Sequence, residues 1–297
     1  MAHSVAVIPC YNEGNNPAAV VASVLVEPLA SVILVDDASD GMSRAALDAL
    51  SLQPRVRVLR NRIRSGKSAA ARRGFENLPA DAANVMMIDG DVVLPPATVR
   101  AVLDELDRVD LVATNSQALQ DPASWWERGA IFSANLQRHM RNRFFDRYPA
   151  RFTNGRFIGM SRRLVDAVLA ASFPPEAEDA HIALVCISQG MTYSFRRDAI
   201  LHGRAPSYLK DYAAQAIRFR DAERILGAYW PKEELAKHFH LRSRDVVRAF
   251  LAEAAQAPPA ALAFTAMYAF SRLASLRRSR ALESGLWPIA TSTKLPG

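Results

Sequence analysis

Short apolar segments alternate with amphipathic segments through the first 115 residues of the chain. The apolar segments are four or five residues long and contain many β-branched side chains, a pattern typical of buried strands. These predicted strands are Ser4–Ile8, Ser31–Val35, Val56–Leu59, Val85–Ile88 and Leu111–Thr114. The predicted helices between them are Pro17–Val26, Ser43–Ser51, Lys67–Asn77 and Pro96–Asp107. This alternation predicts an α/β fold in which a mainly parallel sheet is flanked by helices.

The alternation loosens after residue 115, and the remaining chain is predicted to be mostly helical. Two further strands are expected, one inside Phe152–Met160 and a last one over Thr192–Phe195. From Ser207 onward the pattern is almost entirely helical, and Pro258-Pro259 marks a break between helices. The predicted helices before Ser207 are Pro122–Tyr148, Arg162–Ala171 and Glu178–Gln189.

The composition is that of a folded protein of a reducing compartment. Half of the 297 residues are hydrophobic, which excludes a disordered chain. Two cysteines, Cys10 and Cys186, cannot form a disulfide framework. The first residues lack the pattern of a signal peptide, and Ser271 and Arg272 interrupt the longest weakly polar stretch. We therefore expect a cytoplasmic protein, either free or peripheral on the inner face of the cell membrane.

The net charge of +7 is concentrated near the carboxyl end of the chain. Between Lys237 and Arg280 there are eight basic and two acidic residues. Apolar residues recur at helical spacing over Ala260–Leu276, and Arg277, Arg278 and Arg280 follow. This pattern fits a helix on an anionic membrane surface, and equally a helix that packs on the protein or forms a homodimer. No stacking aromatic residues lie among the basic ones, so we expect no nucleic-acid partner.

Polar side chains follow four of the predicted strands directly or at a short distance. They lie in Pro9–Glu13, at Asp36 and Asp37, in Ser65–Lys67 and in Asp89–Asp91. Because ligands of parallel sheets bind beyond the carboxyl ends of the strands, we expect these side chains to line one site.

Asp89-Gly90-Asp91 is the sharpest of these features. Two carboxylates one residue apart can face one divalent cation, and Mg²⁺ commonly takes one or two carboxylates together with substrate phosphates. A polar turn that ends a strand is the alternative. A phosphate-binding P-loop at Gly66-Lys67 is rejected, because its first glycine would fall at Asn61.

Two features later in the chain are ambiguous when taken alone. Glu178 and Asp179 begin a predicted helix, where acidic residues are also common without any function. His202 could be a metal ligand, a base or a structural histidine.

Seven short motifs, in this order, resemble those of family 2 glycosyltransferases, a large group with the GT-A nucleotide-sugar fold. They span about residues 4–220 and are Val5–Glu13, Val35–Ser39, Gly66–Gly74, Asp89–Asp91, Asn154–Arg163, Glu178-Asp179 and Gln215–Phe219. His202 falls where many GT-A enzymes carry a metal-binding histidine. Phe219 departs from the pattern, since Trp is usual there, and its presence weakens the case for processive polymer synthesis.

The resemblance implies an inverting glycosyltransferase that moves one sugar from a nucleoside-diphosphate sugar, expected to be a UDP-sugar, to an acceptor hydroxyl. A glycan or lipid-linked acceptor of cell-surface polysaccharide synthesis is expected. Asp179 would be the general base, and Asp91 and His202 would hold a Mg²⁺ or Mn²⁺ ion. The residues implied to hold the nucleotide sugar are Pro9, Tyr11, Glu13, Asp37, Lys67, Asp89 and Gly90. Those implied beside the diphosphate and the acceptor are Glu178, Gln215 and Arg218.

The resemblance also divides the chain. Residues 1–220 would form the catalytic domain, with a nucleotide-sugar half of about 1–115 and an acceptor half of about 116–220. Residues 221–297 would form a helical region that associates with a membrane or dimerises. Two other functions stay open: a non-catalytic binding partner in a polysaccharide assembly complex, and a nucleotidyltransferase, which would release pyrophosphate.

Overall fold

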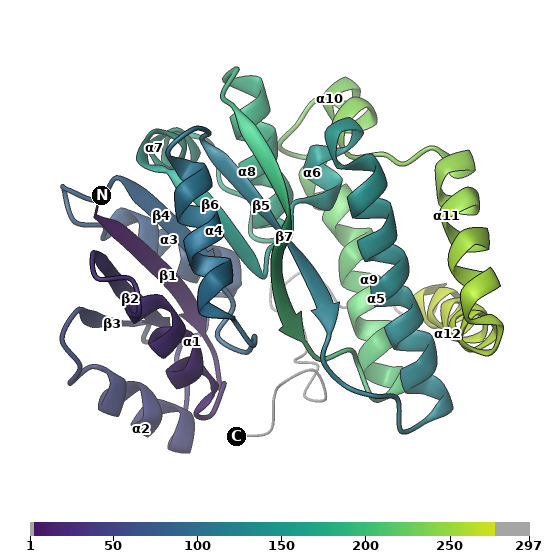
Figure 1. Ribbon diagram of the computed structural model, residues 1–297, viewed down its shortest axis with the longest axis horizontal. Helices are drawn as coiled ribbons and strands as arrows, with labels where there is room; N and C mark the ends of the chain where they lie inside the picture. Colours follow the sequence, from purple (N-terminus) through teal and green to yellow (C-terminus); the bar gives the residue numbers. More distant parts are fainter. Residues whose placement is uncertain (1–2, 277–297) are drawn as a thin grey trace.

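The computed structural model describes residues 3–276, in which seven strands form one sheet flanked by helices (Figure 1). The strands are β1 (Ser4–Cys10), β2 (Ala30–Asp36), β3 (Val56–Arg60), β4 (Asn84–Ile88), β5 (Leu111–Ala118), β6 (Phe157–Ser161) and β7 (Tyr193–Gly203). The helices of the first part are α1 (Asn16–Leu25), α2 (Gly41–Leu50), α3 (Lys67–Glu76) and α4 (Pro96–Leu106). Those that follow β5 are α5 (Trp125–Phe144), the 3₁₀ turn η1 (Phe145–Arg147), α6 (Pro149–Phe152), α7 (Arg162–Ala170), α8 (Glu178–Ser188), α9 (Leu209–Leu226), α10 (Lys232–His238), α11 (Ser243–Gln256) and α12 (Pro258–Leu276).

The sheet is mainly parallel, as the strand pattern predicts. Its strand order is β3-β2-β1-β4-β6-β5-β7, and the neighbours β3, β2, β1 and β4 all run parallel. Only β6, among the strands of the described chain, runs against its neighbours β4 and β5. The carboxyl ends of β1, β2 and β4 therefore meet at one edge, which is where the candidate site lies.

Alternate residues of the central strands bury their side chains on opposite faces of the sheet, as the pleat requires. In β1, Val5 and Val7 pack with α3, α7 and α8, whereas Ala6 and Ile8 pack with α1, α2 and α4. Both faces are apolar because both are covered by helices. The predicted α/β layering is confirmed.

The prediction that the last strand ends at Phe195 is wrong, because β7 continues to Gly203. The pairing with β5 shifts between Thr114 and Asn115, so that Arg197, Asp198 and Ala199 have no partner opposite them. This bulge contains the charged residues Arg197 and Asp198, and regular pairing resumes beyond it. His202 therefore lies inside a strand, not after one.

The helices near the carboxyl end pack on α5, which follows β5 in the chain. A capping box fixes the start of α5, since Ser124 accepts a hydrogen bond from Glu127 N and the Glu127 carboxylate accepts from Ser124 N. A Cβ on Gly129 would lie 2.5 Å from Met267 Sδ and 2.9 Å from the backbone of Ala263, so α12 approaches α5 closely there. Across residues 3–276, no helix has both the length and the apolar character needed to cross a membrane.

The expected boundary at residue 220 falls inside α9, and the division into domains stays a prediction. The basic residues Arg277, Arg278 and Arg280, and the rest of the helical region beyond α12, lie outside the described residues.

Candidate active site

Lys67 lies at the centre of a charged cluster at the carboxyl edge of the sheet. It opens α3, and its Nζ lies 2.6 Å from Asp89 Oδ1 and 3.0 Å from Glu178 Oε1. The same ammonium donates a hydrogen bond of 2.8 Å to the carbonyl of Gly155. Burial by itself would lower the pKa of Lys67, but the carboxylates of Asp89 and Glu178 outweigh burial and raise that pKa above its usual value. The Lys67 ammonium thus joins the start of α3 to the loop at Gly155, more than 80 residues further along the chain.

Glu178 and Asp179 form the first turn of α8 and have different surroundings. Burial favours the neutral form of Glu178, but Lys67 and the Ser68 hydroxyl, 3.0 Å from Glu178 Oε2, outweigh burial and lower its pKa. Asp179 accepts hydrogen bonds from Gly155 N at 3.1 Å and Ala180 N at 2.8 Å. Burial, together with the charge of Glu178, raises the pKa of Asp179 to about 6. Asp179 can therefore take up or release a proton close to neutral pH.

A tight loop brings Gly155 against Asp179. A Cβ on Gly155 would lie 2.8 Å from Asp179 Oδ2, so the close approach requires glycine. The buried Arg141 supports the segment that precedes this loop, with a hydrogen bond of 3.0 Å from its Nε to the carbonyl of Phe152. Asp89 N in turn donates to the carbonyl of Arg156 at 2.9 Å. One short loop thus contacts both Asp89 and Asp179, the predicted base.

Asp37 organises the loop between β3 and α3. Its two carboxylate oxygens accept four hydrogen bonds of 2.7–2.8 Å, from Asn61 Nδ2, Ser65 N, Ser65 Oγ and Gly66 N. Gly66 has a φ of +92°, which favours glycine, and it directly precedes α3. This arrangement sets the position of Lys67. The role of Asp37 in nucleobase binding stays a prediction.

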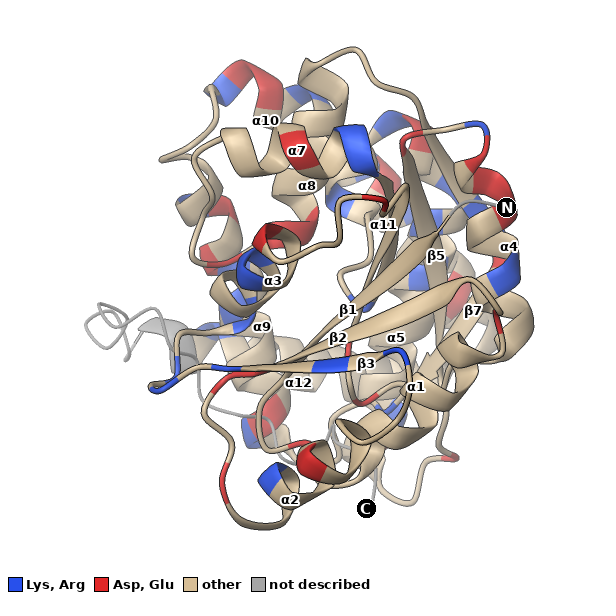
Figure 2. Cartoon of the chain, turned by 90° about the vertical axis from the view of Figure 1, so that its left-hand side faces the viewer, with Lys and Arg blue, Asp and Glu red and all other residues tan. Residues whose placement is uncertain are grey.

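The residues after β1 bring the Glu13 side chain next to the Asp89–Asp91 turn and the Tyr11 ring against Arg64. The guanidinium of Arg64 lies over the Tyr11 ring, 4.3 Å from its centroid. A Cβ on Gly90 would lie 3.4 Å from Cys10 Sγ and 3.5 Å from Glu13 Cγ. Figure 2 shows further basic positions along β3 and the loop after it. A nucleotide bound at this edge would meet cations, one of them already stacked on an aromatic ring.

Pro9 lies within β1 itself, in register with Val35 of β2. It is therefore one step back from the edge at which Tyr11 and Glu13 lie.

Asp91 and His202 come from neighbouring segments. Val93 and His202 exchange two backbone hydrogen bonds of 2.8 and 2.9 Å, which puts His202 beside the turn that contains Asp91. Within residues 3–276, no group of three or more His, Cys, Asp or Glu side chains is placed to hold a metal ion. The donor set at this turn, the carboxylates of Asp89 and Asp91, suits an ion that also binds the phosphates of a substrate.

The cluster extends to α9 through an acid that the sequence did not single out. Burial, together with the nearby charge of Glu178, raises the pKa of Glu176 to about 7, and Arg218 of α9 partly offsets this rise. Arg218 therefore lies close to the acidic cluster, and Gln215 is on the same helix one turn earlier. Within residues 3–276, neither Gln215 nor Arg218 makes a hydrogen bond that would mark a role for it.

Sequence reasoning missed Glu176, Arg64 and the backbone of Gly155. The signal for Glu176 was its position two residues before the acidic pair. Arg64 is in the loop that was rejected as a P-loop, and only the fold brings it to Tyr11. The contacts of Gly155 come from main-chain atoms, which carry no residue-specific signal.

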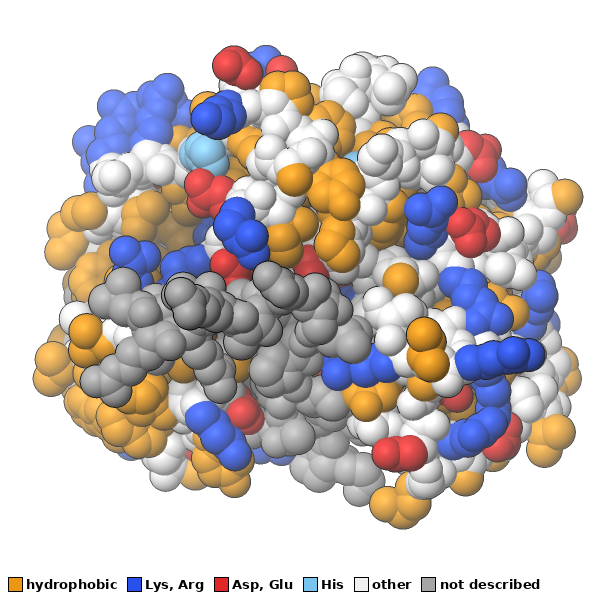
Figure 3. Space-filling view, turned by 180° about the vertical axis from the view of Figure 1, so that it is seen from behind, with side chains coloured by type: hydrophobic (Ala, Val, Ile, Leu, Met, Phe, Trp, Pro, Cys, Tyr) orange, Lys and Arg blue, Asp and Glu red, His pale blue; other side chains and the backbone are white. Residues whose placement is uncertain are grey.

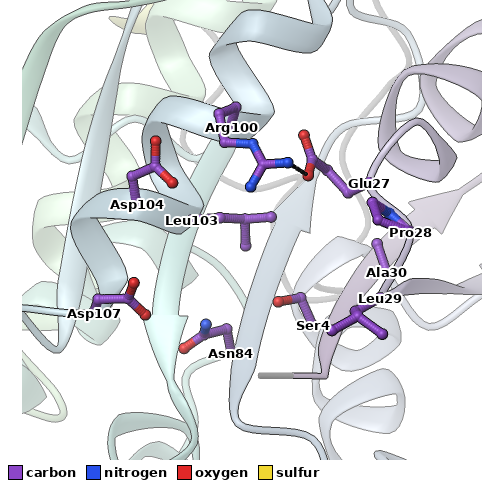
Figure 4. Close-up of a pocket in the computed structure, with 10 residues that line it drawn as sticks. All are labelled: Ser4, Glu27, Pro28, Leu29, Ala30, Asn84, Arg100, Leu103, Asp104 and Asp107. Carbon is purple, nitrogen blue, oxygen red and sulfur yellow. Dashed lines mark ion pairs between the residues drawn. The ribbon is translucent and has the colours of Figure 1, made fainter. Parts of the chain in front are cut away.

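A small pocket at the opposite edge of the sheet, of about 50 Å³, is lined by the first residues of β1, β2 and β4 (Figure 4). It contains an ion pair of 2.5 Å between Arg100 and Glu27. This pocket is too small for a nucleotide sugar, since ligand pockets usually enclose about 300–1,000 Å³.

Solved structures with the same architecture define the class of the fold. The mannosyltransferase PcManGT from Pyrobaculum calidifontis, in complex with GDP-Man and Mn²⁺, matches 94% of this chain and 81% of its own length, with 16% identity and a TM-score of 0.57. TarS (1-349) of S. aureus matches 94% of this chain and 76% of its own, with 13% identity and a TM-score of 0.52. Glucosyl-3-phosphoglycerate synthase from Mycobacterium tuberculosis, in complex with phosphoglyceric acid, matches 77% of this chain and 80% of its own length, with 15% identity and a TM-score of 0.53. The fold is that of the GT-A glycosyltransferases.

The family follows from the sequence. The profile described as Glycosyl transferase family 2 matches residues 5–169, more than half of the chain. The chain belongs to glycosyl transferase family 2, as its motifs predict, and this membership supports a role in glycosyl transfer. None of the curated proteins matches the chain in sequence.

Proposed function

We propose that this chain is a metal-dependent inverting glycosyltransferase that moves one sugar from a nucleoside-diphosphate sugar to an acceptor hydroxyl. The observation that carries the proposal is the link through Lys67, which contacts Asp89 on the donor side and Glu178 on the acceptor side. Family membership and the GT-A fold support the reaction class.

Asp179 is the proposed general base. A base works best when its pKa lies near the working pH, and the pKa of Asp179 is raised to about 6 by burial and by Glu178. In this proposal Asp179 removes the proton of the acceptor hydroxyl as that oxygen attacks the anomeric carbon. The bond between this carbon and the diphosphate oxygen breaks, and the diphosphate leaves with the bonding electrons. Attack from the side opposite the leaving group inverts the anomeric carbon.

The donor nucleotide is proposed to lie at the ends of β1 and β2. Tyr11 would stack on the base, and Glu13, with Gly90 packed against it, would accept hydrogen bonds from the ribose or base edge. A UDP-sugar is the expected donor. Because one structural neighbour binds GDP-Man, guanosine donors belong in the same screen.

A divalent ion is proposed to be held by Asp91 and His202, with Asp89 close by. Mg²⁺ or Mn²⁺ would offset the negative charge that develops on the diphosphate as it leaves. The protein's own contribution to this charge balance comes from Lys67 and Arg218, which lie around the acidic cluster.

Asp179→Asn tests the base directly. We expect transfer to slow by roughly 10³-fold while donor affinity changes by less than about twofold, because the base acts only in the chemical step. The measurements are single-turnover rates, donor titration by calorimetry with Mn²⁺, and NMR of the product anomer. The matched control is Asp81→Asn, whose side chain is 75% exposed, and it should leave both quantities unchanged.

Normal turnover of Asp179→Asn would remove the base from the proposal. Retention of the anomeric configuration would remove the inverting mechanism. Release of pyrophosphate would instead identify a nucleotidyltransferase.

A further inference from the structure

The outer face of α12 is apolar and has no partner among the described residues. Its 19 residues include no acid and one basic residue, Arg272. The inner face is fully buried at Ala263 and Met267. On the outer face the side chains of Leu262 and Leu273 are each 64% exposed. A helix that is apolar on both sides is normally covered on both sides.

The neighbouring helix α11 repeats this pattern. Val247 and Leu251, one turn apart, are 54% and 60% exposed. Arg244 and Arg248, also one turn apart, are exposed beside them. Figure 3 shows hydrophobic side chains gathered at the lower left, where α12 lies in that view.

Neither acid of this region reaches the outer surface. Asp245 is buried, and its carboxylate accepts a hydrogen bond of 3.1 Å from Tyr148 Oη. Glu253 is paired with His139 of α5 at 2.8 Å. The exposed charges of α11 and α12 are therefore basic, and the sequence after α12 adds Arg277, Arg278 and Arg280.

We propose that the outer face of α11 and α12 docks on an anionic lipid surface. A helix that lies in the membrane–water interface needs apolar residues that enter the interface and flanking arginines that meet anionic headgroups. A second copy of this chain is a poorer partner, because a twofold axis would bring the same arginines face to face.

The position of α12 gives this surface a consequence for the substrate, one that rests on the proposed function. The side chain of Arg220 on α9 donates a hydrogen bond of 3.1 Å to the carbonyl of Ser271 on α12. Gln215 and Arg218, expected beside the acceptor, are on that same helix α9. A membrane on α12 would thus lie one helix away from the acceptor side, which favours an acceptor carried by a lipid.

Vesicle binding of the full chain tests the docking. The probes are vesicles of phosphatidylcholine alone and vesicles with one-third phosphatidylglycerol. Leu262→Glu/Leu273→Glu should lower partition onto the anionic vesicles by roughly 100-fold, since two apolar anchors are lost and two negative charges are gained. Arg244→Gln/Arg248→Gln should lower it by roughly tenfold and weaken its salt dependence.

The matched control is Met42→Glu/Leu52→Glu, at side chains that are 86% and 85% exposed on and just after α2. It should change partition by less than about twofold, apart from a general charge effect. Equal loss in this control, equal binding to neutral vesicles, or no vesicle binding by the full chain would each overturn the docking. So would a dimer in light scattering that becomes monomeric in Leu262→Glu/Leu273→Glu.

Circular dichroism melts check that the variants fold. Hydrolysis of a water-soluble donor separates the two proposals, because the docking variants should keep this activity even if lipid binding is lost. If the unaltered chain does not hydrolyse the donor, that result would instead count against the proposed function.

Discussion

Replacement of Lys67 by Met is the substitution whose effect on stability can be calculated most directly from the structure. The change removes one ammonium group from contacts of 2.6 and 3.0 Å with two carboxylates and leaves Asp179 nearby. At an effective dielectric constant of about 20, each contact corresponds to about 5.5–6.5 kcal/mol of Coulomb attraction. Much of this attraction offsets desolvation, and breaking a buried pair from one side costs about 3–5 kcal/mol. Because a third of the Lys67 side chain is exposed, we expect the lower end, about 3 kcal/mol.

This loss should depend on pH. Without Lys67 the pKa values of Glu178 and Asp179 rise in the folded protein, because the ammonium lowers both of them. When the pKa of a carboxyl group is higher in the folded than in the unfolded protein, the folded protein loses stability as the pH rises through the folded-state pKa. The loss in Lys67→Met should therefore be about 3 kcal/mol at pH 7.5 and smaller by about 1–2 kcal/mol at pH 5.5.

Urea denaturation at the two pH values measures both quantities. Lys67→Arg keeps the charge and should retain most of the stability. Lys210→Met removes an exposed lysine and should change the free energy of unfolding by less than about 0.5 kcal/mol. If Lys67→Met costs no more than Lys210→Met, or costs the same at both pH values, the cluster does not depend on this cation.

Three further predictions concern stability. Asp179→Asn should stabilise the protein by about 1–2 kcal/mol at pH 7.5 and by less at pH 5. The reason is that the pKa of Asp179, about 6 in the folded protein, makes its ionisation costly there. Melting temperatures measured against pH check this. Gly129→Val should cost more than about 2 kcal/mol in urea, because the new side chain would collide with Met267, and Gly129→Ala should cost less. Ser124→Ala should cost about 1 kcal/mol through loss of the capping bond to Glu127 N, with Ser124→Asp as the variant expected to restore it.

Periodicity predicted most of the fold, for a physical reason. Both faces of the sheet are buried, so the strands are continuous apolar segments bounded by polar turns. The strand β6 was anticipated, but its direction was not, because pairing direction leaves no mark in a short apolar segment. The end of β7 was missed because Arg196, Arg197 and Asp198 lie at a bulge, where charged residues can face solvent inside a strand.

The candidate site was predictable where it depends on strand ends. Asp89 follows β4 and Lys67 opens α3, and the parallel order brings both to one edge. The sequence could not indicate that Asp37 would use four hydrogen bonds to hold the loop 61–66. Contacts of this kind depend on loop conformation, which hydrophobic spacing does not encode. The functional roles of these residues stay predictions until they are measured.

Gly155 contacts two partners through adjacent peptide groups. Its N–H donates to Asp179, and its carbonyl accepts from Lys67. A small rotation of the backbone at this residue would loosen both contacts together, so a change at Lys67 is expected to reach Asp179, and the reverse. An enzyme built this way is expected to bind its two substrates in a compulsory order, the donor entering first and aligning the base for the acceptor that follows.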